Sequence, residues 1–154
     1  MRIRQDEYPL LRRHVREELV KFCTKNNFSC HVEKTKTPEE FHQLLARAKV
    51  GISVGGGGFD TLRFWEILGN NCLLITETID IYPLDSSELE YSRIWQFGNL
   101  FDFQSQLERV GRFLIEEYRE DSLGDEYAAI MKAHSSVARV QTILNIARKK
   151  GILS

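Results

Sequence analysis

The sequence predicts an α/β protein with a Rossmann-like open parallel sheet flanked by helices and followed by a helical C-terminal tail. Three observations predict this class. Short apolar runs of strand length alternate with amphipathic helical patterns, a run of four glycines joins one such strand to the next helix, and the last third of the chain carries only helical periodicity. Such alternation is typical of parallel βαβ units with helices on both faces of the sheet.

The first part of the chain predicts two helices and a short strand between them. Apolar residues recur at helical spacing over residues 9–25, which predicts a long amphipathic helix. Residues 28–33 alternate apolar and polar positions weakly, which favours a strand. Thr37, a following proline and Glu40 have the order of an N-cap, a first-turn proline and a capping box. A helix is therefore expected over residues 38–49.

Two buried strands and a connecting helix are expected in the middle of the chain. Residues 50–54 form a short apolar run that leads directly into the four glycines, and residues 72–76 form a second such run. Both resemble central strands of a parallel sheet. Between them, residues 62–68 carry a broad apolar side, and Asp60 or Thr61 is available to cap this helix.

The remainder of the chain is expected to be mostly helical. Residues 69–71, Gly-Asn-Asn, favour a left-handed helix end. Residues 77–90 are polar and irregular, and a loop of this length in a compact domain is often functional. Residues 92–97 are expected to form a last strand. Three further helices are predicted at residues 105–118, 125–134 and 137–149.

The composition restricts the class of protein. The chain has 154 residues, 42% hydrophobic and 28% charged, with a formal net charge of -1. These values fit one globular domain over residues 1–154 without the basic surplus that drives nucleic-acid binding. No window approaches the ~20 apolar residues of a membrane span. Three cysteines without CxxC spacing indicate neither a disulfide framework nor a zinc site, so a reducing, cytoplasmic setting is expected.

The four consecutive glycines carry the strongest functional signal. They are Gly55, Gly56, Gly57 and Gly58. Without Cβ atoms they let a ligand approach the backbone, and free N–H groups before a helix favour a phosphate. The alternative is a flexible turn beside a tightly packed strand. The run matches neither GxGxxG nor GxxxxGK[ST], so an oxidoreductase or a Walker-type ATPase is disfavoured.

Charged residues near the glycines supply the other candidates. Arg63 and Glu66 are neighbours on the following helix. They form either a surface ion pair or a site in which Glu66 accepts hydrogen bonds from the two hydroxyls of a ribose. Glu77 follows a buried strand at the sheet edge where a ligand is expected, which makes it the candidate catalytic or donor-sugar carboxylate. Arg12 and Arg13, near the start of the first helix, either lie on a solvated face, which is favoured, or reach a phosphate.

No metal site or bound cofactor is expected. The histidines show no HxxxH or HxH spacing, so surface or capping roles are expected for each. The four are His14, His31, His42 and His134.

Residues 48–75 resemble the donor-binding core of two-lobed, GT-B-type glycosyltransferases, most closely the spore-maturation and exostosin-like branches. There a glycine-rich turn is followed by Asp-Thr-x-Arg-x-Trp-Glu, a short helix end and an apolar strand, as in residues 55–75 here. The likeness continues to His134-Ser135-Ser136 before a last helix. It implies the C-terminal lobe of such an enzyme, which binds a nucleotide-diphosphate sugar as substrate and needs an N-terminal acceptor lobe or a partner chain.

The resemblance also implies roles for single residues. Thr61 would add a hydroxyl at the helix start, Arg63 would pair with phosphate or brace the loop, and Glu66 would hold the ribose. The residues facing the pyrophosphate would be Gly56, Gly57 and Gly58. The commoner retaining pattern of two glutamates separated by seven residues is absent, because the first would fall at Gly58. The chain alone is expected to bind nucleotide without appreciable sugar transfer. The alternative is a non-catalytic, Rossmann-like nucleotide-binding or interaction module.

Overall fold

The computed structural model describes residues 8–56, 61–78, 91–119 and 121–153, the side chain of Ser122 excepted. The chain divides into two compact units, Met1–Tyr118 and Arg119–Ser154, and each is described separately.

The first unit contains a three-stranded parallel sheet in the order β1-β2-β3. The strands are β1 (Val50–Ser53), β2 (Leu73–Glu77) and β3 (Ile94–Phe97). Ile52 of β1 lies opposite Ile75 of β2, so the carboxyl ends of the strands meet at one edge. All five residues of the central strand β2 are buried. The apolar run predicts this for Leu73–Ile75, whereas Thr76 and Glu77 are buried polar residues. The predicted Rossmann-like α/β class is confirmed.

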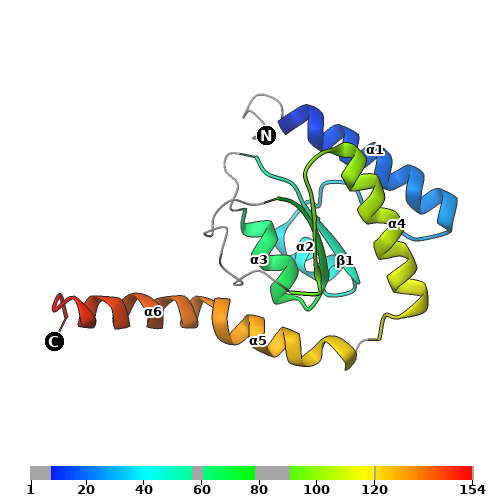
Figure 1. The fold of residues 1–154 in the computed structure, drawn as a ribbon. Helices are drawn as coiled ribbons and strands as arrows, with labels where there is room; N and C mark the ends of the chain where they lie inside the picture. The colour runs from blue at the N-terminus through cyan, green and yellow to red at the C-terminus, as the bar shows by residue number, and fades with distance from the viewer. Residues whose placement is uncertain (1–7, 57–60, 79–90, 120, 154) are drawn as a thin grey trace. The chain divides into compact units, whose positions relative to one another are not determined.

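The described residues of the first unit also form four helices. They are α1 (Tyr8–Asn26), α2 (Pro38–Leu45), α3 (Leu62–Gly69) and α4 (Leu100–Glu116). Helix α3 packs on β1 and β2, whereas α4 packs on β3 and on α1. Figure 1 shows α3 and α4 on opposite sides of the sheet. The core between them includes the buried side chains of Phe64, Ile67, Leu68, Leu74, Ile75, Phe97, Phe103 and Val110.

The start of α2 follows the predicted cap. Thr37 Oγ1 accepts a hydrogen bond from the backbone N–H of Glu40 at 3.1 Å. The Glu40 carboxylate accepts from the backbone N–H of Lys36 at 2.7 Å, one residue before the donor of a standard capping box. The helix ends at Leu45, earlier than the predicted end. It ends there because the backbone N–H groups of Arg47 and of the residue after it bond to carbonyls three residues back, which tightens the turn.

The predicted strand at residues 28–33 is wrong. The Phe28 ring stacks on Phe22 of α1, with centroids 5.9 Å apart, and the Phe28 N–H donates to the carbonyl of Cys23 at 2.9 Å. Phe28 therefore packs on the helix that precedes it, and residues 28–33 form no strand.

The left-handed end predicted for α3 is present, but not at glycine. Asn71 has a φ of 61°, whereas Gly69 is the last helical residue. Asparagine tolerates this conformation better than most residues, which explains the position.

The second unit is helical, as predicted for the C-terminal region. It contains a 3₁₀ turn, η2 (Asp121–Leu123), followed by α5 (Gly124–His134) and α6 (Ser136–Lys149). Ser135 caps α6, because its hydroxyl accepts from the N–H of Ala138 at 3.3 Å. Within the described residues of both units, no helix combines the length and the apolar composition needed to cross a bilayer.

Candidate functional site

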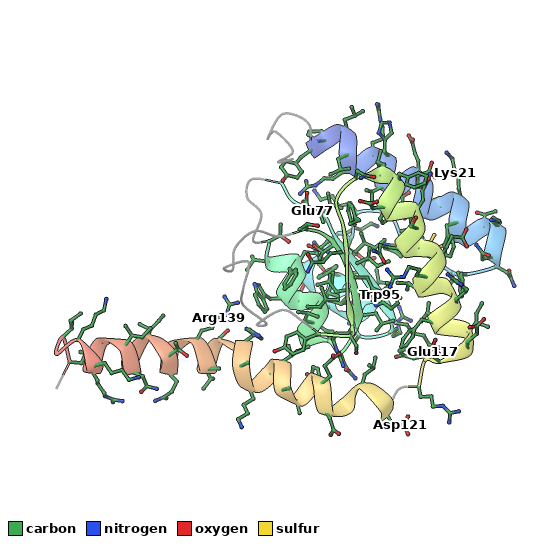
Figure 2. The ribbon with its side chains drawn as sticks, in the orientation of Figure 1. Lys21, Glu77, Trp95, Glu117, Asp121 and Arg139 are labelled. Atoms are coloured by element: carbon green, nitrogen blue, oxygen red, sulfur yellow. The ribbon has the colours of Figure 1, made fainter. Side chains whose placement is uncertain are left out.

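The glycine run and Glu77 meet at the carboxyl edge of the sheet. Gly55 and Gly56 follow β1 after one intervening residue, Val54, and Glu77 is the last residue of β2. Gly55 is buried, and only 6% of Glu77 is exposed. Figure 2 shows Glu77 near the first turns of α1. The structure thus brings together two of the residues selected from the sequence.

Gly55 packs closely against Glu77 of β2 and Tyr8 of α1. Its backbone N–H donates to the Glu77 carboxylate. A Cβ on Gly55 would overlap the Glu77 carboxylate and the ring of Tyr8. Glycine is therefore required at position 55 by packing, whether or not a ligand binds.

The groups around Gly55 have shifted proton affinities. Burial raises the pKa of Glu77, and this effect exceeds the opposing influence of the Gly55 N–H and of the Arg12 cation. Burial, followed by the nearby Glu77 charge, raises the pKa of Tyr8. The Tyr8 hydroxyl is buried and interacts with the carboxyl group of Glu77. The edge therefore holds a carboxyl group and a phenol whose pKa values are both raised.

Arg12 of α1 lies against the same turn. Its Nε donates to the carbonyl of Gly55 at 3.0 Å, and its Nη2 lies 3.5 Å from the carbonyl of Val54. A Cβ on Gly56 would overlap the guanidinium. The prediction of a solvated face for Arg12 is therefore incomplete, since the side chain is exposed and also tied to the glycine turn.

The sequence did not identify Tyr8 or connect Arg12 with the glycines. The Arg12 contact with Gly55 joins residues 43 positions apart. Neither residue belongs to a local motif, so the only available signal was a basic side chain near the start of a helix.

Thr61 stands at the N-cap position of α3 but does not use its hydroxyl as a cap. The hydroxyl instead shares a hydrogen bond with the Ser53 hydroxyl at 2.8 Å. The predicted capping bond is wrong for Thr61, because the end of β1 supplies a partner. This bond joins the end of β1 to the start of α3 beside the turn. Gly57, Gly58 and Asp60 lie outside the described residues.

Arg63 and Glu66 lie together, as their spacing predicts. Arg63 Nε is 3.6 Å from a Glu66 carboxylate oxygen, and the guanidinium stacks over the Phe41 ring of α2 at 3.7 Å. Within the described part of the chain, the side-chain partners of Arg63 are thus Phe41 and Glu66, and the structure does not bring Arg63 to Gly55 or Gly56. The roles of Arg63 on phosphate and of Glu66 on ribose stay predictions.

The described cysteines are free thiols, and they differ in burial. Cys23 and Cys72 are buried free thiols and Cys30 is exposed. Burial raises the pKa of Cys72 to about 11. Across the described ranges, no three histidine, cysteine or acidic side chains gather in a way that suits a metal ion.

The fold and the site together define the chain at the level of class. It is an α/β protein with a Rossmann-like parallel sheet and a glycine-rich turn at the carboxyl edge, where Arg12 and Glu77 flank the turn. Comparisons with protein-family models, curated proteins and solved structures give no match. The more particular assignment is therefore a proposal.

Proposed function

We propose that the chain is the donor-binding lobe of a glycosyltransferase and that it binds a nucleotide-diphosphate sugar. The observation that carries this proposal is the position of Gly55 and Gly56, which follow β1 at the carboxyl edge of the parallel sheet and precede α3 in the chain. Open α/β sheets bind their ligands at this edge. A helix start and a nearby cation both favour a diphosphate there.

The chemistry required of such a lobe is electrostatic. When the sugar passes to its acceptor, the bond between the anomeric carbon and the phosphate oxygen breaks, and the nucleoside diphosphate leaves with added negative charge. Backbone N–H groups and a guanidinium that are already oriented lower the energy of that charge. The lobe positions the donor, and a second lobe or a partner chain supplies the acceptor.

A non-catalytic nucleotide-binding or interaction module is the second candidate, and a specific observation favours it. The N–H of Gly55 is already bonded to Glu77, and Arg63 is already paired with Glu66 and Phe41. Because these groups are already engaged within the chain, part of the motif has a structural explanation.

Ligand titration tests the proposal. UDP, GDP, ADP and their sugar conjugates should be added at up to millimolar levels, with binding followed by calorimetry and by the melting temperature. A ligand at 100 times its Kd stabilises a protein by about 2.7 kcal/mol, which for a chain of this size raises the melting temperature by several degrees. A donor lobe should bind one nucleotide sugar more tightly than the matching nucleotide.

The Glu66→Ala variant tests the ribose assignment, and Glu117→Ala is its control, because Glu117 is an exposed glutamate just beyond α4. We expect weaker binding only for Glu66→Ala. If no nucleotide changes the melting temperature of the wild-type chain, the donor-lobe proposal is wrong. Equal binding by Glu66→Ala would remove the ribose role alone.

A further inference from the structure

The guanidinium of Arg12 is held at the glycine turn by an element outside the strand–turn–helix motif. Gly55 and Gly56 come between β1 and α3 in the chain, whereas Arg12 belongs to α1. The bond from its Nε to the Gly55 carbonyl, at 3.0 Å, fixes one edge of the planar group. The absence of a side chain at Gly56 leaves the space that the guanidinium occupies. Position and orientation of this cation are therefore set before any ligand arrives.

Most of the donors of this cation are not used by the described residues. A guanidinium has five N–H groups. One makes a well-formed bond to Gly55, and a second reaches the Val54 carbonyl only at 3.5 Å. Arg12 is exposed. At least three N–H groups are thus available to an anion, in the planar arrangement that suits bidentate binding of phosphate oxygens.

Tyr8 is the other side chain of α1 at this turn. It is 4% exposed, its ring lies against Gly55, and its hydroxyl interacts with the Glu77 carboxyl group. The unused hydrogen-bonding capacity at the turn therefore belongs to Arg12.

We propose that Arg12 binds the diphosphate of a nucleoside diphosphate at the Gly55-Gly56 turn and is the principal side-chain cation of that site. This inference rests on the proposed function and extends it, because the resemblance places the phosphate contacts within residues 55–66 only. It also gives Arg12 a role that Arg63, turned to Phe41 and Glu66, does not fill in the described structure.

Calorimetric titration of the full chain with inorganic pyrophosphate, UDP, GDP and ADP tests this inference. The variants are Arg12→Gln and Arg12→Lys, with Arg13→Gln as the matched control, because Arg13 is the next residue of α1 and is also exposed. Circular dichroism should establish that each variant is folded. Arg12→Lys keeps the charge, so it still tests binding if Arg12→Gln does not fold.

We expect Arg12→Gln to lower the affinity for pyrophosphate and for the bound nucleotide by about 10- to 100-fold, the range for hydrogen bonds to charged groups. Arg12→Lys should retain part of the affinity, because it lacks the planar fork. Arg13→Gln should change it less than twofold.

The outcomes separate this inference from the proposed function. Nucleotide binding that Arg12→Gln and Arg12→Lys leave unchanged would overturn the role of Arg12 and leave the donor lobe in place. Arg12-dependent binding of pyrophosphate, with no added affinity for any nucleotide, would support the anion site and contradict the donor lobe. Failure of the wild-type chain to bind pyrophosphate or nucleotide would overturn both.

Discussion

Replacement of Gly55 by alanine tests the packing at the carboxyl edge of the sheet. The new Cβ would overlap two neighbours, the Glu77 carboxylate and the ring of Tyr8. Glu77 ends the buried central strand, and Tyr8 is buried in the first turn of α1. Because both side chains are buried, neither can move aside into solvent to make room for the new methyl group. Either the Gly55 N–H bond to Glu77 lengthens or the first turn of α1 shifts away from the sheet.

The magnitude follows from these two losses. Forcing an extra methyl group into a packed interior costs about 1–3 kcal/mol. A hydrogen bond to a charged group contributes about 1.5–3 kcal/mol, of which a lengthened bond loses only part. We therefore expect Gly55→Ala to lower the free energy of unfolding by roughly 2–4 kcal/mol.

Gly69→Ala is the matched control. A Cβ on Gly69 meets no atom within 4 Å, and the residue is the last of α3. Alanine is favoured over glycine in helices by up to about 1 kcal/mol. The same chemical change should therefore leave the stability unchanged or raise it slightly.

Urea unfolding followed by tryptophan fluorescence measures both variants. The two tryptophans, Trp65 and Trp95, belong to the first unit, so the signal reports the unit that contains Gly55. If Gly55→Ala unfolds within about 0.5 kcal/mol of wild type, the typical scatter for surface substitutions, the close contact of Gly55, Glu77 and Tyr8 is refuted.

Three further predictions concern thiols, pH and capping. Iodoacetamide at pH 8 should label exposed Cys30 in the native chain and should label Cys72 only on unfolding. The pKa of Cys72 is raised from 9.0 to about 11, so this residue should hold about 100-fold less thiolate than an unperturbed cysteine. Mass spectrometry of the labelled peptides checks this, and equal labelling of the two cysteines would contradict the burial of Cys72. Burial raises the pKa of Glu77 above its ordinary 4.5. The stability that Glu77 contributes through this shift is therefore fully present below pH 4.5 and is lost as the pH rises through the pKa of Glu77 in the folded protein. Glu77→Gln should therefore flatten the fall in urea midpoint above pH 4.5, and an unchanged pH profile would exclude Glu77 as its source. Thr37→Ala should lower the free energy of unfolding by about 0.5–2 kcal/mol, because it removes the hydroxyl that caps α2. Thr37→Ser keeps that hydroxyl and should leave the free energy of unfolding unchanged. Thermal unfolding of the two variants measures the difference.

The parts of the fold that were predicted correctly depend on residues that are close in sequence. The apolar run of β2 is buried throughout, and the cap at Thr37 uses a donor three residues away. The error at residues 28–33 has the opposite origin. There Phe28 packs on α1, and alternation over six residues does not distinguish such packing from a strand.

In the candidate site too, some contacts could be predicted from the sequence and others could not. The approach of Glu77 to the glycines was predictable, because parallel strands bring their carboxyl ends to one edge. Arg12 and Tyr8 reach that edge only because α1 lies there, and no local pattern encodes the position of α1. The Thr61 hydroxyl also bonds to a residue of another element, Ser53 of β1. A capping rule that considers only neighbouring residues does not predict this bond.

The contact between Gly55, Tyr8 and Glu77 has an evolutionary consequence. Because a side chain at position 55 would occupy space now held by the other two, these three positions should vary together across divergent relatives. A relative with alanine at position 55 should carry a smaller residue at position 8 or a shorter acid at position 77. Position 56 should vary with position 12 instead, so two neighbouring glycines would belong to two separate groups of co-varying positions, one of three and one of two.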